Sequence, residues 1–360
     1  MINAGRFFVP GPTEVRPEVL DAMRRPMIFH RTAEMEALMR RVNAGLGGVF
    51  GTRRPVHIIT GSGTSAMEMA IRNGATHRVL SIVHGDFGER FAKLAVACGR
   101  QVVRLTAAPG DVVPLDRIRD ALNSDDFDTV LATHSETALG VRADMAGIAA
   151  LVRERPDCLL LVDAVSSAGA MPIAMDDWGV DAVVAASQKA LALPPGLAFA
   201  AVSERFVARA RGLTDRGAYL DVLKYEDFTA RNQSPTTPAV SLLFALDRQM
   251  VDIGRETLAA RFARHDAMLA ACSAWVDGKG AGLGLSHMTT PTHRSASVTC
   301  LRTTRKTADV LAAMREEGFE LGGGQGEFTA NTFRVGHMGD HTVAGTTDML
   351  NVLERVLQKR

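Results

Sequence analysis

Short β-branched and apolar runs alternate with longer amphipathic stretches through the first half of the chain. The runs predict seven strands: Val56–Thr60, Arg78–Val83, Gln101–Leu105, Thr129–Thr133, Cys158–Asp163, Asp181–Ser187 and Leu197–Val202. Helical patterns lie between them at Ser65–Asn73, Phe87–Cys98, Leu115–Leu122 and Asp144–Glu154. Strands that alternate with helices build βαβ units. The pattern therefore predicts an α/β fold with a mostly parallel seven-stranded sheet.

The pattern changes after about Arg211, where a polar stretch from Gly212 to Pro238 begins. A long helical pattern then runs from near Val240 to about Trp275 and leads into a second domain. That domain is predicted to hold a glycine-rich turn at Gly278–Gly284, strands at Ser295–Arg302 and Thr332–Val335, and helices at Thr307–Glu317 and Thr342–Leu357. A length of 360 residues also favours more than one core. We expect an N-terminal arm over 1–20, a large domain over 21–245 and a smaller C-terminal α+β domain over 246–360.

The balance of charge restricts the partners. The chain has 41 basic and 40 acidic residues, so it lacks the basic excess of a nucleic-acid or membrane-surface protein. No apolar run approaches the ~20 residues of a membrane span, and the first residues do not resemble a secretory signal. The four scattered cysteines form no C-x-x-C motif and are expected to be reduced core thiols of a cytoplasmic protein: Cys98, Cys158, Cys272 and Cys300.

A glycine-rich turn, Gly61–Ser65, follows the first predicted strand and precedes a helix. Glycines let a backbone approach a ligand, and a helix N-terminus offers free N–H groups to an anion. The turn is therefore a candidate phosphate cradle, although an ordinary strand-to-helix turn with a Ser or Thr cap fits the same letters. It is neither a P-loop, because no Gly-Lys-Ser/Thr follows, nor a good dinucleotide fingerprint, because the third glycine is missing.

Other strand ends carry chemical groups. Asp163 ends an apolar strand, and a buried carboxylate needs a cationic partner such as a protonated pyridine nitrogen; the alternative is a cap of the next turn. Phe87 stands between a strand and a helix, where its ring would cover a flat cofactor or act as a hydrophobic staple. The run Thr133–Thr137 is too polar to be core throughout.

Lys189 is one of only six lysines and the only one that follows an apolar strand. A desolvated lysine has a lowered pKa and becomes a nucleophile. Carboxyl ends of parallel strands share one edge of a sheet, where such folds bind ligands. We therefore expect Gly63, Asp163 and Lys189 to lie close together. Arg334 lies on a short strand of the second domain, where it would bind a substrate carboxylate through two guanidinium N–H groups or make a surface ion pair. No metal site is predicted.

Together these residues resemble the class V, fold-type I aminotransferases that depend on pyridoxal 5′-phosphate (PLP), the group of alanine–glyoxylate, serine–glyoxylate and serine–pyruvate aminotransferases. The resemblance covers nearly the whole chain. Its motifs are Phe8–Thr13, His30-Arg31, Gly61–Thr64, Thr133–Thr137, Asp163–Ser167, Ser187–Gly196, Thr236–Ser241 and Phe333–Gly339.

The resemblance implies a role for each matched residue. Lys189 would form the Schiff base with PLP and later move a proton, and Asp163 would hold the pyridinium. Phe87 and Val165 would pack on opposite faces of the ring, and Thr137 would bind the ring hydroxyl. The cofactor phosphate would be held by Ser62, Gly63, Thr64, Gln188 and, from the partner subunit of a homodimer, Thr236. Arg334 would bind the substrate carboxylate near the backbone of Gly11. The region Asn232–Pro235 lacks a tyrosine that some relatives place near this phosphate.

These roles imply ping-pong transfer of an amino group from alanine, serine or aspartate to glyoxylate or pyruvate. Three alternatives stay open. A phosphonate or phosphorylated amino acid would need further cations, such as Arg31 or Arg231. A cysteine desulfurase or other PLP-dependent lyase would need a nucleophilic cysteine on a mobile loop, but Cys272 and Cys300 lie in predicted elements. A non-catalytic dimeric scaffold would lack cofactor absorbance.

Overall fold

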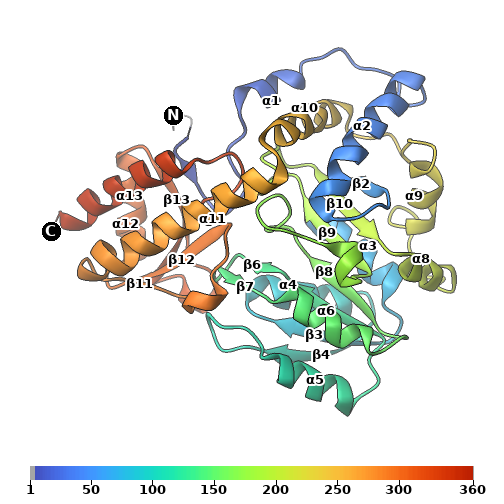
Figure 1. Cartoon of the computed structure of the whole chain (residues 1–360), viewed down its shortest axis with the longest axis horizontal. Helices are drawn as coiled ribbons and strands as arrows, with labels where there is room; N and C mark the ends of the chain where they lie inside the picture. The colour runs from blue at the N-terminus through green and yellow to red at the C-terminus, as the bar shows by residue number, and fades with distance from the viewer. Residues whose placement is uncertain (1–4, 360) are drawn as a thin grey trace.

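The computed structural model describes residues 5–359 and builds them around two sheets (Figure 1). The larger sheet has seven strands in the order β2-β10-β9-β8-β5-β3-β4. Their bounds are β2 Val56–Thr60, β3 Arg78–Val83, β4 Gln101–Thr106, β5 Thr129–Thr133, β8 Leu159–Asp163, β9 Ala182–Ala186 and β10 Leu197–Val202. Only β10 runs antiparallel to its neighbours, β2 and β9. The predicted mostly parallel seven-stranded sheet is confirmed.

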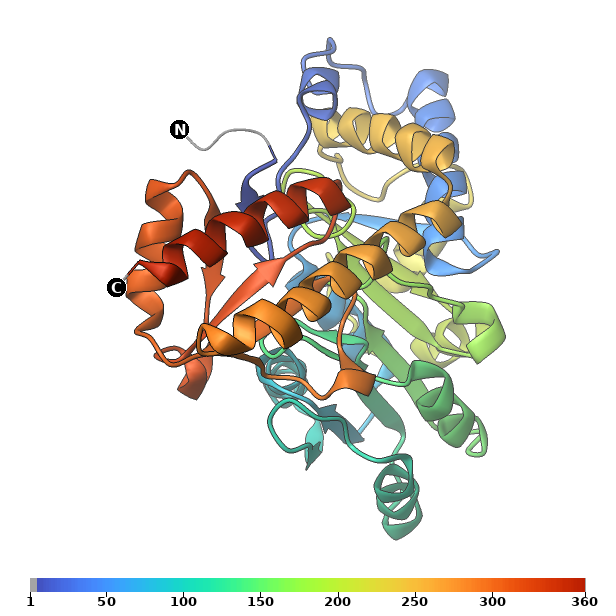
Figure 2. The same ribbon diagram turned by 60° about the vertical axis from the view of Figure 1, so that its left-hand side comes forward.

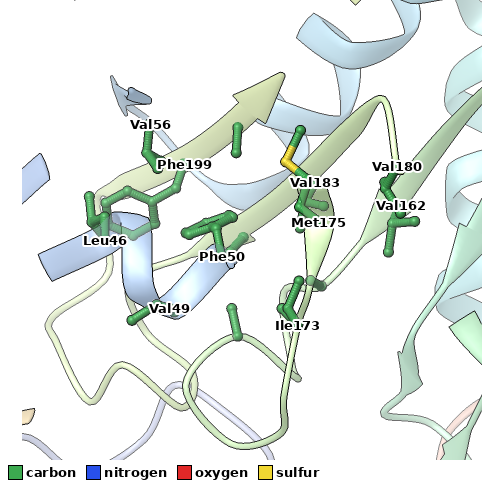
Figure 3. Close-up of a cluster of buried hydrophobic side chains, with 14 of the residues drawn as sticks. Leu46, Val49, Phe50, Val56, Val162, Ile173, Met175, Val180, Val183 and Phe199 are labelled. Atoms are coloured by element: carbon green, nitrogen blue, oxygen red, sulfur yellow. The ribbon is translucent and has the colours of Figure 1, made fainter. Parts of the chain in front are cut away.

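Helices cover both faces of this sheet, because its strands are apolar on both sides. Leu160 and Val162 of β8 belong to one buried cluster, and Leu159 and Leu161 belong to the other. The first cluster includes residues of α2 (Ala33–Phe50), α5 (Leu115–Ser124), α6 (Met145–Arg153), α7 (Met175–Trp178) and α10 (Val240–Glu256). The second includes residues of α3 (Gly63–Gly74), α4 (Asp86–Ala97), α8 (Glu204–Arg211) and α9 (Val222–Thr229). Figure 3 shows the first cluster where Leu46, Val49 and Phe50 of α2 lie near Phe199 of β10.

The smaller sheet has the order β1-β13-β14-β12-β11. Its strands are β1 Phe7–Phe8, β11 Leu285–His287, β12 Val298–Thr303, β13 Glu320–Gly323 and β14 Thr332–Gly336. Three helices pack with it: α11 Leu258–Trp275, α12 Thr307–Glu316 and α13 Val343–Gln358. Figure 2 shows α11 and α13 side by side across this part of the molecule. Because β1 pairs with β13, the N-terminal segment forms part of the smaller, mostly C-terminal sheet. The chain then continues into α1 (Pro17–Ala22), which packs on α10 beside the larger sheet.

Two predictions of local structure are wrong. The helical pattern from Val240 to Trp275 is two helices, because Thr257 has a positive φ of 67° and its hydroxyl accepts a hydrogen bond from the Ala260 N–H, which begins α11. The segment Gly278–Gly284 is helical up to residue 282, with a turn only at its end, because it continues α11 through a π-helical turn at Val276–Gly280. Val276 and Gly280 are buried there, so packing outweighs the low helix propensity of glycine.

The polar stretch from Gly212 to Pro238 contains α9, a helix that the sequence analysis did not predict. The domain limits at residues 20 and 245 stay predictions, and residues 1–4 of the predicted arm lie outside the described part of the chain. Within residues 5–359, no helix has the length and apolar character that a membrane crossing requires.

Candidate active site

The carboxyl ends of β2, β3, β5, β8 and β9 meet at one edge of the large sheet. A direct contact between the turns that follow these strands demonstrates this. A Cβ atom on Gly63, after β2, would lie 3.0 Å from Val165 Cγ2, after β8, and 3.2 Å from the Ala186 Cβ of β9. The predicted neighbourhood of Gly63, Asp163 and the Lys189 segment is therefore present.

Lys189 is fixed by the turn that follows the fully buried strand β9. Its carbonyl accepts hydrogen bonds from the Ala192 N–H (2.8 Å) and the Thr13 hydroxyl (2.9 Å). The side chain is buried, with Nζ donating to the Pro10 carbonyl and lying 5.9 Å from the centroid of the Phe87 ring. Burial, the main cause, and the nearby Arg334 lower the pKa of the Lys189 amine to about 8.

Gly11 lies directly against the Lys189 side chain. A Cβ atom there would come within 2.5 Å of both Cδ and Nζ of Lys189, and φ at Gly11 is +101°, so only glycine fits. The Thr13 N–H donates to the Gln188 carbonyl at 3.0 Å and ties the same segment to the lysine turn. The N-terminal segment thus forms one wall of the site.

Asp163 ends β8 with its carboxylate buried. One carboxylate oxygen accepts a hydrogen bond from the Val165 N–H at 2.8 Å, so Asp163 does cap the next turn. Burial raises the pKa of the Asp163 carboxyl to about 6, against the opposing effects of the Val165 N–H, Lys189 and Arg90. No cationic side chain forms an ion pair with Asp163 among residues 5–359. The carboxylate can therefore accept a cationic partner.

The predicted phosphate cradle is the start of α3. Ser62 is the N-cap residue with its own side chain free of a capping hydrogen bond, and it is exposed; Gly63 is buried and Thr64 half-buried. The Gln188 side chain has a buried Oε1 atom without a hydrogen-bond partner in the described structure, and only its amide NH2 group could donate to a phosphate. Thr236 is exposed, and its segment approaches the edge where the Ala239 N–H donates to Thr60 Oγ1 at 3.1 Å. The cradle is thus open toward the outside of the chain.

Arg334 lies on β14 of the smaller sheet and faces the larger one. Its guanidinium donates to the Gly323 carbonyl (2.8 Å), to Gln325 Oε1 (3.1 Å) and to the Thr137 carbonyl (3.4 Å). All three acceptors are neutral, and the described residues place no carboxylate within ion-pair distance. Burial lowers the pKa of Arg334, yet an arginine stays charged. The partly buried guanidinium of Arg334, which has no ion-pair partner among the described residues, can therefore bind an anion. Arg334 does not make the surface ion pair that was the alternative expectation.

Two further predicted residues lie between Asp163 and Arg334. Thr137 Oγ1 is 2.5 Å from Ser166 Oγ, so the segment after β5 is joined to the turn that carries Val165. Val165 itself is half-buried beside Gly63. Thr236 is the predicted site residue that lies apart from the others, in the segment before α10.

The sequence analysis missed Glu136 as a separate site residue, although it lies in the polar run Thr133–Thr137. Its fully buried carboxyl accepts hydrogen bonds from the N–H groups of Phe87, Gly88 and Ala138, each 3.0 Å long. Burial raises the pKa of this carboxyl to about 7. Glu136 thereby holds the first turn of α4, which carries Phe87. Arg90, also missed, lies over the Phe87 ring at 4.8 Å.

A buried lysine and a buried carboxylate at the edge of a mostly parallel sheet, opposite an unpaired arginine from a second sheet, define a fold-type I, PLP-dependent transferase. The family model for class V aminotransferases matches residues 7–325. The chain therefore belongs to the class V aminotransferase family and is an aminotransferase.

Relatives agree over nearly the full length. An uncharacterized aminotransferase of Methanocaldococcus jannaschii is 35% identical, over 96% of this chain and 90% of its own. An L-aspartate–glyoxylate aminotransferase of Paracoccus denitrificans is 32% identical, over 99% and 92%. A relative from Synechococcus named as a small subunit of soluble hydrogenase is 33% identical, over 99% and 94%. Among solved structures, an alanine–glyoxylate aminotransferase from Nostoc is similar with a TM-score of 0.91 and 30% identity, over 99% and 96%.

Proposed function

We propose that this chain moves the amino group of alanine, serine or aspartate to glyoxylate or pyruvate, with PLP attached to Lys189. The observation that carries the proposal is the unpaired Arg334 guanidinium near the buried Lys189 amine, which matches an α-amino acid by its carboxylate and its amino group. Relatives named for aspartate, serine and alanine with glyoxylate support this substrate class.

The residues present fit PLP. Gly63 is packed so closely against Val165 and Ala186 that a side chain would not fit there, Gln188 has a buried amide oxygen without a hydrogen-bond partner, and Asp163 is a buried carboxylate without an ion-pair partner among residues 5–359. Ser62, Thr64 and Thr236 would complete the phosphate contacts, and Phe87, Val165 and Thr137 would contact the ring. PLP, when bound, withdraws electrons from the carbon that bears the amino group.

The chain's own groups would then perform proton transfer. Asp163 would face the pyridine nitrogen, and this cation would favour the ionised carboxylate that burial alone disfavours. Lys189, once freed by the substrate amine, would take the proton from the substrate Cα atom. A pKa of about 8 leaves a useful fraction of neutral amine near neutral pH, which a general base requires.

Two alternatives find less support in the geometry. Arg31 and Arg231 both lie over the Phe228 ring, and Arg31 donates to the Ser234 carbonyl at 2.7 Å, so neither arginine is placed beside Arg334 for a second substrate anion. All four cysteines are free and buried, and burial raises their pKa values. A nucleophilic thiolate for desulfurase chemistry would need the opposite.

We also propose a cytoplasmic homodimer with its active sites at the interface. The exposed Thr236 and the open side of the phosphate cradle support a contribution from the partner subunit. Exposed apolar side chains at Leu20, Met27 and Phe29, with exposed fractions of 46%, 67% and 64%, offer a surface for that contact. Four free cysteines suit a reducing compartment.

The first experiment locates the cofactor and the amino donor. The purified protein is loaded with PLP, reduced with borohydride and digested; the expected mass increase falls on the peptide with Lys189. Lys189→Ala should remove the label, whereas Lys93→Ala, on exposed α4, should keep it. The unreduced protein is then titrated with alanine, serine and aspartate, and the spectral change identifies the donor. Label retained in Lys189→Ala would disprove the attachment, and no spectral change with any donor would disprove the transfer.

The second experiment tests the carboxylate role of Arg334. Arg334→Ala should raise KM for the amino donor about ten- to a hundredfold, because a charge-assisted contact contributes about 1.5–3 kcal/mol. The rate with an amine that lacks a carboxylate should change little. Equal losses with both substrates would refute the assignment.

A further inference from the structure

Arg261 of α11 is the largest fully buried side chain of the described protein, with 1% of its surface exposed. A buried guanidinium is costly unless its donors are satisfied. It lies outside the residues assigned to the reaction above. Its hydrogen-bond partners show which segments this buried charge holds in place.

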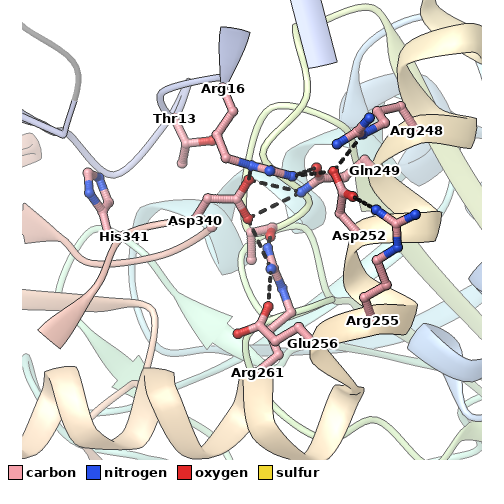
Figure 4. A network of polar contacts seen from close by, with 12 residues as sticks. Thr13, Arg16, Arg248, Gln249, Asp252, Arg255, Glu256, Arg261, Asp340 and His341 are labelled. Carbon is pink, nitrogen blue, oxygen red and sulfur yellow. Dashed lines mark hydrogen bonds and ion pairs between the residues drawn. The ribbon is translucent and has the colours of Figure 1, made fainter. Parts of the chain in front are cut away.

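Arg261 donates hydrogen bonds to four partners, and Figure 4 shows two of them, Glu256 and Asp340. Nε donates to the Gly169 carbonyl at 3.1 Å, and Nη2 to the Ala190 carbonyl at 2.7 Å. Nη1 donates to Asp340 at 3.0 Å and to Glu256 at 2.9 Å, and these two carboxylates balance its charge. Four of the five guanidinium N–H groups are therefore used, two of them on backbone carbonyls.

Three of these partners lie on turns or loops that directly adjoin a segment carrying a residue of the site. Gly169 ends the turn that begins at Asp163, and Ala190 follows Lys189 directly. Asp340 lies in the loop that leaves β14 just after Arg334. The Arg261 guanidinium thus connects the three segments that follow Asp163, Lys189 and Arg334.

Each of these turns contains a residue with a positive φ, and in the Lys189 turn that residue is not a glycine. Gly169, Ala192 and Gly339 have φ values of 88°, 51° and 82°. Ala192 is an alanine in the left-handed region, which persists only when its surroundings hold it. The Lys189 and Gly339 turns also touch, since a Cβ atom on Gly339 would lie 3.2 Å from the Ala192 Cβ.

Neighbouring residues on the same face of α11 complete the support. Arg264 donates to the carbonyls of Gly339 (3.1 Å) and His341, and His265 Nε2 accepts from the Gly339 N–H at 3.1 Å. From the N-terminal segment, Arg16 donates to Asp340 at 2.6 Å. Asp340 is therefore held by Arg16 of the N-terminal segment and by Arg261 of α11. Of the three α11 residues, Arg261 is the one that also contacts the Lys189 turn.

We propose that Arg261 is a positioning residue for the transamination reaction, because it sets Asp163, Lys189 and Arg334 in register by holding their three turns. The inference rests on the roles proposed for those residues. A lysine cannot replace Arg261, because an ammonium on a flexible stem cannot reach four acceptors that surround a planar fork.

Arg261→Lys tests this with the charge retained. We expect kcat to fall about tenfold or more, since small misplacements of reacting groups cost up to about a hundredfold. In the PLP-free protein, the pH midpoint for amine labelling of Lys189, followed by mass spectrometry, should shift from the wild-type value. Burial of the amine, followed by the charges of Arg334, Asp163 and Arg90, sets that midpoint, so it reports the packing and the charges around Lys189. Wild-type kcat together with a wild-type midpoint would overturn the proposal, whatever the melting temperature.

Arg248→Lys is the matched control. Arg248 belongs to the same network through Asp252 (2.8 Å) but touches none of the three turns, so kcat and the labelling midpoint should stay unchanged. If Arg261→Lys does not fold, Asp340→Asn carries the test, since it weakens the contacts of Asp340 with Arg261, Arg16 and Gln249 but leaves the contact of Arg261 with the Ala190 carbonyl in place. It should raise KM for the amino donor and leave the labelling midpoint of Lys189 unchanged; a wild-type KM would overturn the proposal.

The labelling experiment separates this inference from the proposed function. If the wild-type protein takes up no PLP, the proposed function fails, but the Lys189 midpoint still shows whether Arg261 controls the environment of the amine. If PLP binds and transfers amino groups while Arg261→Lys behaves as wild type, only the positioning role fails.

Discussion

At the scale of single residues, the site concentrates charged and titratable groups that burial perturbs in opposite directions. The Lys189 amine has its pKa lowered, whereas the carboxyls of Asp163 and Glu136 have theirs raised. Each group is therefore held toward its neutral form before a ligand arrives. Sites that need a neutral amine and a proton-sharing carboxyl are built in this way.

Replacing Lys189 should show the cost of burying its amine. The pKa falls from an ordinary value near 10.5 to about 8, so the unfolded chain binds more protons between these values and wild-type stability rises with pH there. Below pH 8 both states are protonated and the full penalty applies. Lys189→Met should therefore be more stable than wild type at pH 7 in the PLP-free protein, and this advantage should shrink toward pH 10.

Urea denaturation at pH 7, 8.5 and 10 measures the effect. Lys93→Met, which alters an exposed lysine of α4, serves as the control and should show a difference from wild type that does not depend on pH in this way. A Lys189→Met advantage that stays constant from pH 7 to pH 10 would contradict the lowered pKa.

Individual site residues differed in how far the sequence could predict them. Lys189 and Asp163 were found because each follows an apolar strand, and strand direction alone places such residues at one edge. Glu136 and Arg261 were not found, because the partners that tie them to the site lie far away in sequence. Only the tertiary structure brings the Phe87 N–H to Glu136 or the Ala190 carbonyl to Arg261.

At the scale of elements, strands were predicted better than the junctions between helices. Four of the seven strands of the large sheet have the predicted bounds, because buried parallel strands are uninterrupted apolar runs. The break between α10 and α11 falls at Thr257, three residues after Gly254, and no glycine or proline occupies the break itself. It depends on Thr257, whose φ of 67° and ψ of 146° lie in a region that glycine alone adopts readily.

Thr257 makes two opposite contributions, which substitutions can separate. Thr257→Ala keeps the backbone strain but loses the cap on the Ala260 N–H, which should cost about 1 kcal/mol. Thr257→Gly relieves the strain and costs only a few tenths as a cap, so it should stabilise by about 1 kcal/mol. For a chain of 360 residues the melting temperature should change by about 1–2 °C in each direction. If calorimetry shows that both variants lower it equally, the strained junction is not present.

At the scale of the whole molecule, the N-terminal segment connects the two sheets. It adds β1 to the smaller sheet, places Gly11 against Lys189, and then packs α1 on α10 beside the larger sheet. The same segment presents Leu20, Met27 and Phe29 to the outside. Its two faces thus serve the active site of this chain and, in the proposed homodimer, the partner subunit.

The exposed residues of this segment provide the test of assembly. Phe29 is 64% exposed, and burying a phenylalanine contributes about 1.5–3 kcal/mol per side chain, twice in a symmetric dimer. Phe29→Asp should therefore shift the protein from dimer to monomer in light scattering, and PLP affinity should fall with it because Thr236 of the partner no longer closes the phosphate cradle. Val96→Asp, which changes an apolar side chain that is 51% exposed on α4, should leave both the mass and the PLP affinity unchanged. A monomeric Phe29→Asp variant with full PLP affinity would show that Thr236 of the partner does not contribute to PLP binding. A wild-type protein that is monomeric would refute the homodimer.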